Sequence, residues 1–418
     1  MFLSERLEPK ASMDFEKKLG LIFPDSEPEV KEIPLEKRPS DKKKIPVCEP
    51  SLTELESAYV SKVMRSKWIS SLGPEVKMFE KEFAEKIGTK YAISCTSGTT
   101  ALHLALAALN VKPGEEVIIP TFTMIATINA ILYCGGTPVL VDVDESMNMD
   151  VKQLEKKITR RTVGILPVHI YGEPCNMGEI LRIANKHKLF VVEDVAESHG
   201  AKYKGKMTGS IGDIGCFSFY SNKIISIGEG GILTTNHEEL AERIRTKMNH
   251  SFSPERHFCH RLVGFNYRMT ALQAAVGRAQ LVRWDEILHK KEQLKKRYVS
   301  NLLMTPRITI PPLQIDSSGD DIESVCWMFG VLVSKEIKNR VRAELANRGI
   351  ETRNFFIPLH LQPIYYSKFK KQRYPVSESL MERGFYLPSA SDLTLKEIDY
   401  VCENLIDIVN NGFGKIYD

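Results

Sequence analysis

An acid and a lysine, each following an apolar run, are the residues best suited to do chemistry in this sequence. Residues 190–192 lead into two acids, of which Asp194 is the second. A β-type run at 214–220 ends shortly before Lys223, and a glycine-rich turn at 228–231 follows. In an α/β pattern, residues that follow apolar strands lie at the carboxyl edge of a sheet. The sequence therefore predicts a site at that edge, with Asp194 and Lys223 in it.

An amine and a carboxylate in this arrangement suit pyridoxal phosphate. The aldehyde of this cofactor forms a Schiff base with a lysine, and a carboxylate holds the proton on its ring nitrogen. The protonated ring then accepts an electron pair. Because only a neutral amine is a nucleophile, burial or a nearby cation must lower the pKa of Lys223. Taken alone, Lys223 has the alternative of an ordinary exposed loop lysine.

The same stretch resembles the core of the DegT/DnrJ/EryC1/StrS sugar aminotransferases, which have the fold of aspartate aminotransferase. The lysine of that family lies between a Phe-Ser-Phe strand and a Gly-Glu-Gly-Gly turn, which residues 217–219, Lys223 and 228–231 match in order and spacing. The resemblance covers about residues 45–412. It implies an α/β fold-type-I pyridoxal-phosphate transferase, with a mostly parallel seven-stranded sheet between helices and a smaller α+β C-terminal domain.

The resemblance also implies which residues hold the cofactor. The small-residue turn 96–100 precedes an Ala- and Leu-rich helix at 101–109, so from its residues alone it is either a phosphate site or a simple helix cap. In the family this turn binds the phosphate, here through Gly98 and Thr99, and Ser218 adds a hydroxyl. Asp194 is assigned to the ring nitrogen. Met124 stands where relatives often have an aromatic side chain on the ring, and a core methionine is the alternative.

Four further positions are interpreted in the same way. Glu197 stands where relatives commonly have glutamine beside the phenolic oxygen of the cofactor, and a carboxylate there is repulsive unless it is protonated or a cation intervenes. In having glutamate at this position, the sequence resembles the GDP-perosamine synthase-like branch of the family. Asn266 matches an asparagine that reaches the cofactor phosphate of a partner subunit, which implies a homodimer with shared active sites. His360 is either a substrate contact or structural, whereas His169 is more readily structural.

The resemblance implies an aminotransferase that moves an amino group from glutamate to a nucleotide-linked 4-keto-6-deoxy sugar. The favoured reaction makes GDP-perosamine from GDP-4-keto-6-deoxymannose for a surface polysaccharide such as the lipopolysaccharide O-antigen. Amination at C3 and a UDP or dTDP sugar are the alternatives. A 3-dehydratase branch has histidine at the lysine position, so Lys223 argues against it. A non-catalytic regulatory protein on the same fold is an alternative of a different class.

Composition excludes several other classes. The chain has 418 residues, of which 43% are hydrophobic and 26% charged, and a net charge of +4, which does not indicate a nucleic-acid partner. Eight scattered cysteines without a CxxC motif are typical of a reducing compartment, so we expect a cytoplasmic protein. The uncharged stretch 117–141 is interrupted by prolines and glycines and predicts strand, helix and strand instead of a membrane span. The segment 257–260 has no standard metal-site spacing, and we expect no metal.

The chain is expected to contain a polar extension (1–45), a large cofactor-binding domain (46–270), and a connecting helix with a small domain (271–418). Ser51 is predicted to cap a first helix that ends near residue 63. One continuous helix is predicted over 271–303. The small domain is predicted to contain strands near 325–333 and 350–356, a helix near 337–348 and a last helix near 395–409.

Overall fold

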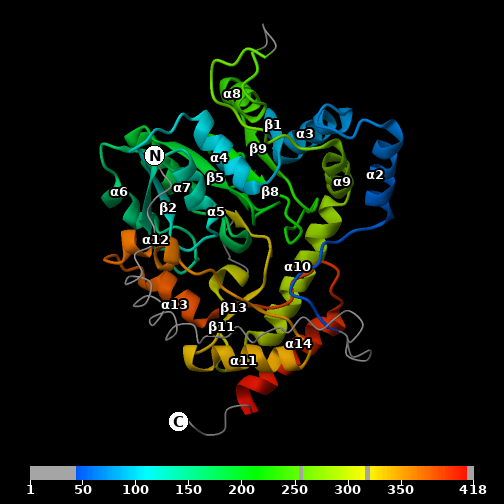
Figure 1. Ribbon diagram of the computed structural model, residues 1–418. Coiled ribbons are helices and arrows are strands. Elements are labelled where there is room, and N and C mark those ends of the chain that lie inside the picture. The colour runs from blue at the N-terminus through cyan, green and yellow to red at the C-terminus, as the bar shows by residue number, and fades with distance from the viewer. Residues whose placement is uncertain (1–43, 254–257, 316–320, 412–418) are drawn as a thin grey trace.

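A seven-stranded sheet forms the centre of the molecule. The computed structural model describes residues 44–253, 258–315 and 321–411. The strand order is β1-β9-β8-β5-β4-β2-β3, and only β9 runs antiparallel to its neighbours in this sheet (Figure 1). The strands are Tyr91–Cys95 (β1), Glu116–Pro120 (β2), Thr137–Val141 (β3), Thr162–Ile165 (β4), Phe190–Asp194 (β5), Ile214–Ser218 (β8) and Gly231–Thr235 (β9).

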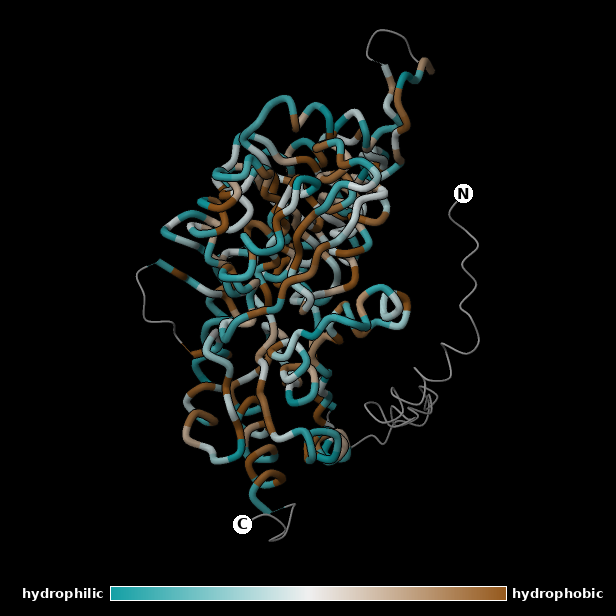
Figure 2. The backbone as a smooth tube through the Cα atoms, turned by 90° about the vertical axis from the view of Figure 1, so that its left-hand side faces the viewer, coloured by the Kyte–Doolittle hydropathy of each residue, from teal (hydrophilic) through white to brown (hydrophobic). Residues whose placement is uncertain are grey.

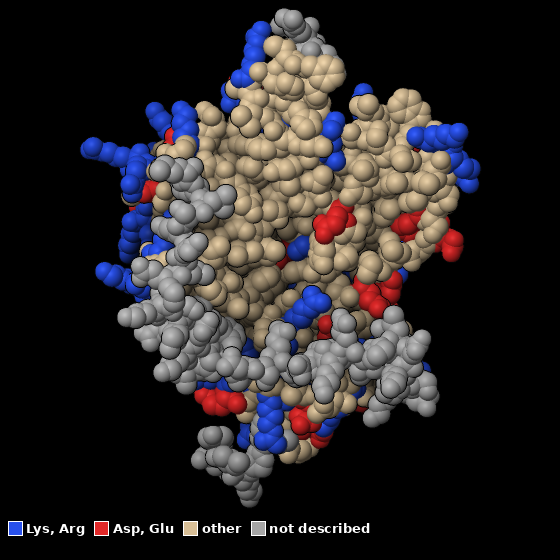
Figure 3. All heavy atoms as spheres, in the orientation of Figure 1, with Lys and Arg blue, Asp and Glu red and all other residues tan. Residues whose placement is uncertain are grey.

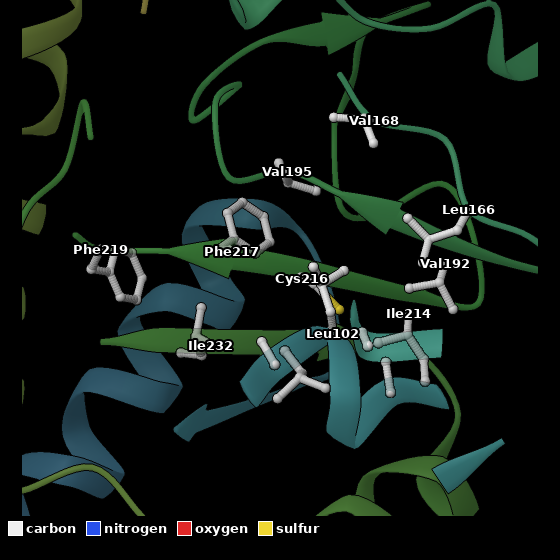
Figure 4. Close-up of a cluster of buried hydrophobic side chains, with 14 of the residues drawn as sticks. Leu102, Leu166, Val168, Val192, Val195, Ile214, Cys216, Phe217, Phe219 and Ile232 are labelled. Atoms are coloured by element: carbon white, nitrogen blue, oxygen red, sulfur yellow. The ribbon is translucent and has the colours of Figure 1, made fainter. Parts of the chain in front are cut away.

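Each face of the sheet packs into its own apolar core. β2 directs Val117 and Ile119 into one buried cluster and Ile118 into another, because successive side chains of a strand point to opposite faces. Figure 4 shows part of the first cluster, in which Phe217 of β8 and Leu102 of α4 lie among the side chains between strands and helix. A fully buried side chain of this size contributes about 1.5–3 kcal/mol. Because side chains on both faces of the sheet are buried, the strands are held in place, and so are the strand ends on which the site is built.

Helices cover both faces of this sheet. The capped start of α4 is the helix end that matters for the site, because it follows directly from the end of β1. The helices of this part are Glu54–Ser66 (α2), Pro74–Ile87 (α3), Gly98–Ala108 (α4), Ala126–Tyr133 (α5), Leu154–Lys157 (α6), Met177–His187 (α7), Glu238–Met248 (α8) and Ala271–Val282 (α9). Short 3-10 turns lie at Val151–Gln153 (η2) and Ile170–Gly172 (η3).

The C-terminal part builds a second core around a small antiparallel sheet of order β11-β13-β12. The elements are Trp284–Leu302 (α10), Pro312–Gln314 (η4), Gly330–Leu332 (β11), Lys335–Asn347 (α11), Arg353–Asn354 (β12), Leu359–Leu361 (η5), Pro363–Phe369 (α12), Pro375–Arg383 (α13), Gly384–Tyr386 (β13) and Leu395–Asn411 (α14). Its buried cluster draws on residues 294–409 together with Ile45. A third sheet joins Ile322–Glu323 (β10) to Lys202–Tyr203 (β6) and Lys206–Met207 (β7).

The single helix predicted over 271–303 is wrong, and so is the predicted cap at Ser51. Two helices, α9 and α10, meet at Arg283, whose backbone has φ −93° and ψ 5°. The buried Arg283 guanidinium donates to the Ser51 carbonyl at 3.0 Å and to Glu56 Oε1 at 3.1 Å. The Ser51 hydroxyl accepts from the same guanidinium at 2.9 Å, so Thr53 caps α2 in its place. The buried Arg283 thus lies at the junction of the two helices and occupies the Ser51 hydroxyl.

The predicted fold class is confirmed. The stretch 117–141 forms β2, α5 and β3, as predicted, and Figure 2 shows hydrophobic backbone segments in the middle of the molecule. None of the helices in the described ranges is long and apolar enough to cross a membrane. The domain division at residues 45 and 270 stays a prediction, and residues 1–43 lie outside the described residues.

Candidate active site

The carboxyl edge of the sheet brings the predicted acid and lysine into one site. β5 ends at Asp194, which lies opposite Cys216 on the parallel strand β8. β8 ends at Ser218. Lys223 follows in a turn in which its backbone N–H donates to Tyr220 O at 2.8 Å. Lys223 Nζ lies 3.8 Å from Oε1 of Glu197, three residues after Asp194, and the charge of Lys223 lowers the pKa of Asp194.

Asp194 is a carboxylate that is only 5% exposed. Its Oδ2 accepts from the Thr127 hydroxyl at 3.0 Å, and its Oδ1 accepts from the Ala196 N–H at 3.2 Å. Burial raises its pKa, and the two hydrogen bonds and the charge of Lys223 offset part of that rise. A buried carboxylate of this kind favours a partner that bears a proton or a positive charge, which a pyridine nitrogen supplies when protonated.

Lys223 is held without a short hydrogen bond to its nearest acid. Its side chain is 12% exposed, and its Nζ lies 3.8 Å from Glu197 Oε1, longer than a normal hydrogen bond. On another side, Nζ lies 3.9 Å from the centre of the Trp327 ring. Burial lowers the pKa of the amine, against the opposing effects of Glu197 and Asp194. The structure therefore enriches the neutral, nucleophilic form of the amine.

Glu197 is a second buried acid in the site. Its Oε2 accepts from the Tyr171 backbone N–H at 2.9 Å, which Tyr171 presents from a left-handed conformation (φ 50°, ψ 17°) that bulky residues rarely adopt. Burial raises the pKa of Glu197 to about 7, although Lys223 lowers it in part. Near neutral pH a large share of Glu197 is protonated. A protonated carboxyl can donate a hydrogen bond to an anionic oxygen, so the raised pKa lessens the repulsion expected from the sequence.

The start of α4 forms a cradle for an anion. Ser97 caps this helix, with its hydroxyl accepting from Thr100 N at 3.2 Å. Gly98 and Thr99 open the helix, so their N–H groups have no intrahelical acceptor and add to the positive end of the helix dipole. A Cβ on Gly98 would lie 2.6 Å from Ser218 Cβ. Only glycine allows this close approach of α4 to the end of β8, which brings the Ser218 hydroxyl beside the helix start.

Polar atoms near the lysine and its acids also fit a bound group. Tyr171 Oη, Asn222 Oδ1 and His199 Nε2 are buried and make no hydrogen bond with the described residues. Buried polar atoms in native proteins are nearly always hydrogen-bonded, so these three, like Glu173 Oε2, Asn249 Oδ1 and Ser251 Oγ elsewhere in the described residues, are free to pair with a bound group. The amine, the two acids and the start of α4 are chemically suited to the aldehyde, ring nitrogen, phenolic oxygen and phosphate of pyridoxal phosphate.

Two of the predicted cofactor residues, Met124 and Asn266, are exposed at the surface of the single chain. Met124 is 49% exposed, and its sulfur lies 3.0 Å from Ala126 N. Asn266 is also exposed, and its Oδ1 accepts from Arg268 Nε at 3.0 Å. Both side chains are accessible to a cofactor ring or to a second subunit. The assignment of Met124 to the ring and of Asn266 to a partner's phosphate stays a prediction.

The two histidines singled out in the sequence are buried in hydrogen-bond networks. His360 is 2% exposed, and its two nitrogens lie 2.9 Å from Thr121 Oγ1 and 3.3 Å from Glu378 Oε1. His169 is fully buried, accepts from Cys175 N at 3.0 Å and lies 3.0 Å from Glu193 Oε2. With both nitrogens of each ring engaged, the structure favours the structural alternative for both histidines.

Sequence reasoning missed Trp327, whose ring lies against Lys223. It was assigned only to a small-domain strand, and its distance of 104 positions from the lysine (327 − 223) gave no sign of contact. Thr127 and Asn222 were also missed, although Asn222 directly precedes the lysine. A tryptophan in an apolar stretch is normally a core residue, so the sequence alone held no signal that would have found it.

A weakly basic amine, a buried carboxylate and an anion cradle at the carboxyl edge of this sheet define a pyridoxal-phosphate enzyme of fold type I. The match to relatives is more specific. The chain belongs to the DegT/DnrJ/EryC1/StrS aminotransferase family, whose sequence model matches residues 50–406. It is an aminotransferase, and its cofactor is pyridoxal phosphate.

Individual relatives align over nearly their whole length. The GDP-perosamine synthases of Escherichia coli O157:H7 and Caulobacter vibrioides are each 42% identical to the chain, over 365 and 375 residues. These alignments cover 87% and 88% of this chain and 98% and 100% of the relatives. The solved structure of Spr1654 from Streptococcus pneumoniae in its PLP form is 29% identical, with a TM-score of 0.83, and covers 88% of this chain and 98% of that one.

The structure indicates neither a metal centre nor a disulfide. In the described parts of the chain, no three His, Cys, Asp or Glu side chains form a group that could hold a metal ion. His257, part of the metal motif considered in the sequence, lies outside the described residues. All eight cysteines are described, and each is unpaired.

Proposed function

We propose that this aminotransferase transfers the amino group of glutamate to a nucleotide-linked 4-keto-6-deoxy sugar, with GDP-4-keto-6-deoxymannose as substrate and GDP-perosamine as product. The family and the site geometry support amino transfer. Identity of 42% to two GDP-perosamine synthases over almost their full length supports this choice of sugar. Glu197 adds to it, since a buried carboxylate with a pKa of about 7 departs from the glutamine that is common in the family.

Each residue at the sheet edge has a distinct part in this reaction. When bound, pyridoxal phosphate supplies an aldehyde that carries the amino group and a ring that accepts an electron pair. Lys223 holds that aldehyde through its amine and, once released by the amino donor, takes and returns a proton at Nζ. Asp194 keeps the ring nitrogen protonated, because its negative charge is buried and lacks a full countercharge. Glu197 directs a carboxyl toward the phenolic oxygen.

The phosphate and the open face of the ring define the rest of the proposed site. Gly98 and Thr99 offer backbone N–H groups to the phosphate, and Ser218 offers its hydroxyl. Met124, with 49% of its surface exposed, is proposed to cover the ring with its thioether. Asn266 is proposed to reach the phosphate in a second subunit. His360 is buried and paired with Thr121 and Glu378, so we propose a structural role for it and not a contact with the sugar.

We further propose a homodimer with shared active sites. Several large apolar side chains are exposed in the single chain, namely Trp68, Leu72, Leu262, Val263 and Met124, with 57%, 77%, 62%, 82% and 49% exposure. Figure 3 shows few charged side chains around α4 on the face in view, while Lys and Arg gather at its left edge. Exposed apolar surface of this kind is typical of a protein interface. Light scattering should give twice the chain mass, and Asn266→Ala should weaken cofactor binding without dissociating the dimer.

The proposed product is a sugar linked to a nucleoside diphosphate, which is an activated glycosyl donor. We therefore infer that it feeds the assembly of a surface polysaccharide, such as a lipopolysaccharide O-antigen, inside the cytoplasm. The eight unpaired cysteines support a reducing compartment.

The decisive test of the substrate uses purified protein, glutamate and a panel of keto-sugar nucleotides. The panel contains GDP-4-keto-6-deoxymannose, UDP and dTDP 4-keto-6-deoxy sugars, and 3-keto sugars. Each amino product is identified by mass spectrometry and NMR, which locate the new amine on the ring. We expect GDP-4-keto-6-deoxymannose to react with the highest kcat/KM and to give GDP-perosamine. Amination of a UDP or dTDP sugar with no reaction of the GDP sugar would refute the perosamine assignment and leave the aminotransferase assignment intact.

A further inference from the structure

The indole of Trp327 makes two contacts with the lysine turn. Its ring centre lies 3.9 Å from Lys223 Nζ. Its Nε1–H donates to the carbonyl of Asn222, the residue before the lysine, at 2.6 Å. Trp327 is 2% exposed, so its ring shields one side of the amine from solvent. One side chain therefore contacts both the reactive atom and the backbone that carries it.

Trp327 is itself held in place on both sides. Its backbone N–H donates to Tyr171 O at 3.3 Å, and its carbonyl accepts from the buried Lys291 amine at 2.7 Å. Two residues further on, Phe329 N donates to Ser389 Oγ at 2.9 Å. The indole also stacks on the Tyr171 ring at 5.9 Å between centres. This network fixes the ring over the amine and leaves it little room to swing away.

We propose that Trp327 is the positioning residue of Lys223: its ring covers the amine against water, and its N–H fixes the turn that aims the amine. The inference deepens the proposed function and rests on it, since it takes Lys223 as the amine that holds the cofactor. Without the indole, the same lysine would still stand at the sheet edge, but as a hydrated and more mobile side chain.

Two effects of the ring on the amine oppose one another, and their sizes decide the outcome. A cation–π contact stabilises the charged amine and raises its pKa by roughly 0.4–1.5 units. Exclusion of water disfavours the charged amine by up to about 3–5 units when burial is complete. Burial is also the largest influence on the pKa of Lys223, which it lowers. Removing the ring should therefore raise the pKa of the amine.

The other groups that face Lys223 do not reverse this direction. Asp194 and Glu197 raise the pKa of the amine, and Cys48 acts in the same sense to a smaller degree. Burial raises the pKa of the Cys48 thiol and lowers that of the His199 ring to about 3, so both groups are uncharged near neutral pH. These groups stay in place when Trp327 is replaced, so their contribution cancels in a comparison of variants.

The test measures the amine directly in the full-length protein after the cofactor has been removed. Acetic anhydride labels neutral amines, so the labelling rate of Lys223 as a function of pH, followed by peptide mass spectrometry, gives its pKa as a midpoint. The variants are Trp327→Ala, which removes cover and hydrogen bond, and Trp327→Phe, which keeps an aromatic cover. Phe329→Leu is the matched control, because Phe329 is fully buried in the C-terminal core and stacks on Tyr298 at 4.7 Å.

We expect the midpoint of Trp327→Ala to rise by about one unit or more, that of Trp327→Phe to rise by less than half as much, and that of Phe329→Leu to stay at the wild-type value. An unchanged or lowered midpoint in Trp327→Ala would overturn the proposal. Equal shifts in Trp327→Ala and Phe329→Leu would also overturn it, because they would show general loosening. Failure of the wild-type protein to attach the cofactor at Lys223 is a separate result, which would refute the proposed function instead.

Discussion

Two buried lysines, Lys223 and Lys291, have the same side chain and opposite environments. Lys291 is 3% exposed, and its amine donates to the carbonyls of Trp327 and Ser389 at 2.7 and 2.5 Å. Lys223 has an acid at 3.8 Å and an aromatic face at 3.9 Å. Burial lowers the pKa of both amines. Lys291 is engaged by short hydrogen bonds, whereas Lys223 lies close to its partners without a short hydrogen bond to them.

This difference separates a structural amine from a reactive one. A buried donor with short hydrogen bonds stabilises the fold, and its removal leaves carbonyls unpaired. An amine that is buried but not bound carries a cost in stability and gains reactivity. The two acids that end β5 differ in the same way. Glu193 accepts from the N–H groups of Gly209, Ile211 and Gly212 at 2.9, 2.8 and 2.7 Å, whereas Asp194 accepts from only one N–H group and one hydroxyl.

The largest effect should come from Lys223→Ala. We expect aminotransferase activity to fall by about 10⁴-fold or more, because the variant loses both the amine that holds the cofactor and the group that moves the proton. The free energy of unfolding should stay within about 1 kcal/mol of wild type, since no short hydrogen bond is lost. The rate of turnover with glutamate as amino donor measures the loss of activity, and unfolding in urea measures the free energy of unfolding. A variant that unfolds readily would place Lys223 with Lys291 in the structural class.

Asp194→Asn should lower kcat by roughly 10³-fold, because a neutral amide no longer holds a proton on the ring nitrogen. Glu193→Gln is the matched control, one position earlier and fully buried. It should lose stability by about 1–3 kcal/mol through weaker hydrogen bonds and keep more activity per folded molecule than Asp194→Asn. Steady-state kinetics, with kcat expressed per folded molecule, distinguishes Asp194→Asn from Glu193→Gln. Equal losses of kcat would remove the special role of Asp194.

Lys291→Met should lower the free energy of unfolding by about 1–3 kcal/mol. The thioether keeps most of the side-chain length, but the Trp327 and Ser389 carbonyls lose their shared donor. Urea unfolding followed by far-UV circular dichroism measures the change. A variant as stable as wild type would show that these two hydrogen bonds do not offset the burial of the amine, and the contrast with Lys223 would fail.

The smallest effect concerns pH. Burial raises the pKa of Glu197 to about 7, above its ordinary value of about 4.3, so the folded state binds this proton more tightly than the unfolded state. The stability linked to this group is present below the unfolded pKa and is lost as pH rises toward 7. Glu197→Gln lacks the titration, so between pH 6 and 8 wild type should lose about 1–2 kcal/mol relative to the variant. Parallel stability curves would contradict the raised pKa.

The sequence predicted the sheet edge well because the signals there are local. Apolar strands that end at Asp194 and at Ser218, and the small-residue turn at Gly98, are readable one segment at a time. The resemblance then joined them into one site, and the structure places Glu197 beside Lys223. The structure places Asp194 and Ser218 at the ends of their strands, as predicted, and the cofactor roles of these residues stay predictions.

The failures have a common cause in contacts between distant segments. At the helix break Arg283 donates to the carbonyl of Ser51, which lies 232 positions away, and no proline or glycine marks the break in the sequence. Trp327 reaches Lys223 through tertiary packing of the C-terminal part. Asn266 is exposed, and its predicted contact with a second subunit stays a prediction. Such pairings depend on how whole elements pack, which propensity and periodicity do not encode.

The most direct test of the account is to identify the amine that carries the cofactor. Borohydride reduction makes the bond between the cofactor aldehyde and its amine permanent, and peptide mass mapping then locates it. The account predicts a single modified residue, Lys223, with no modification of Lys291. A cofactor attached to any other lysine, or to none, would contradict it.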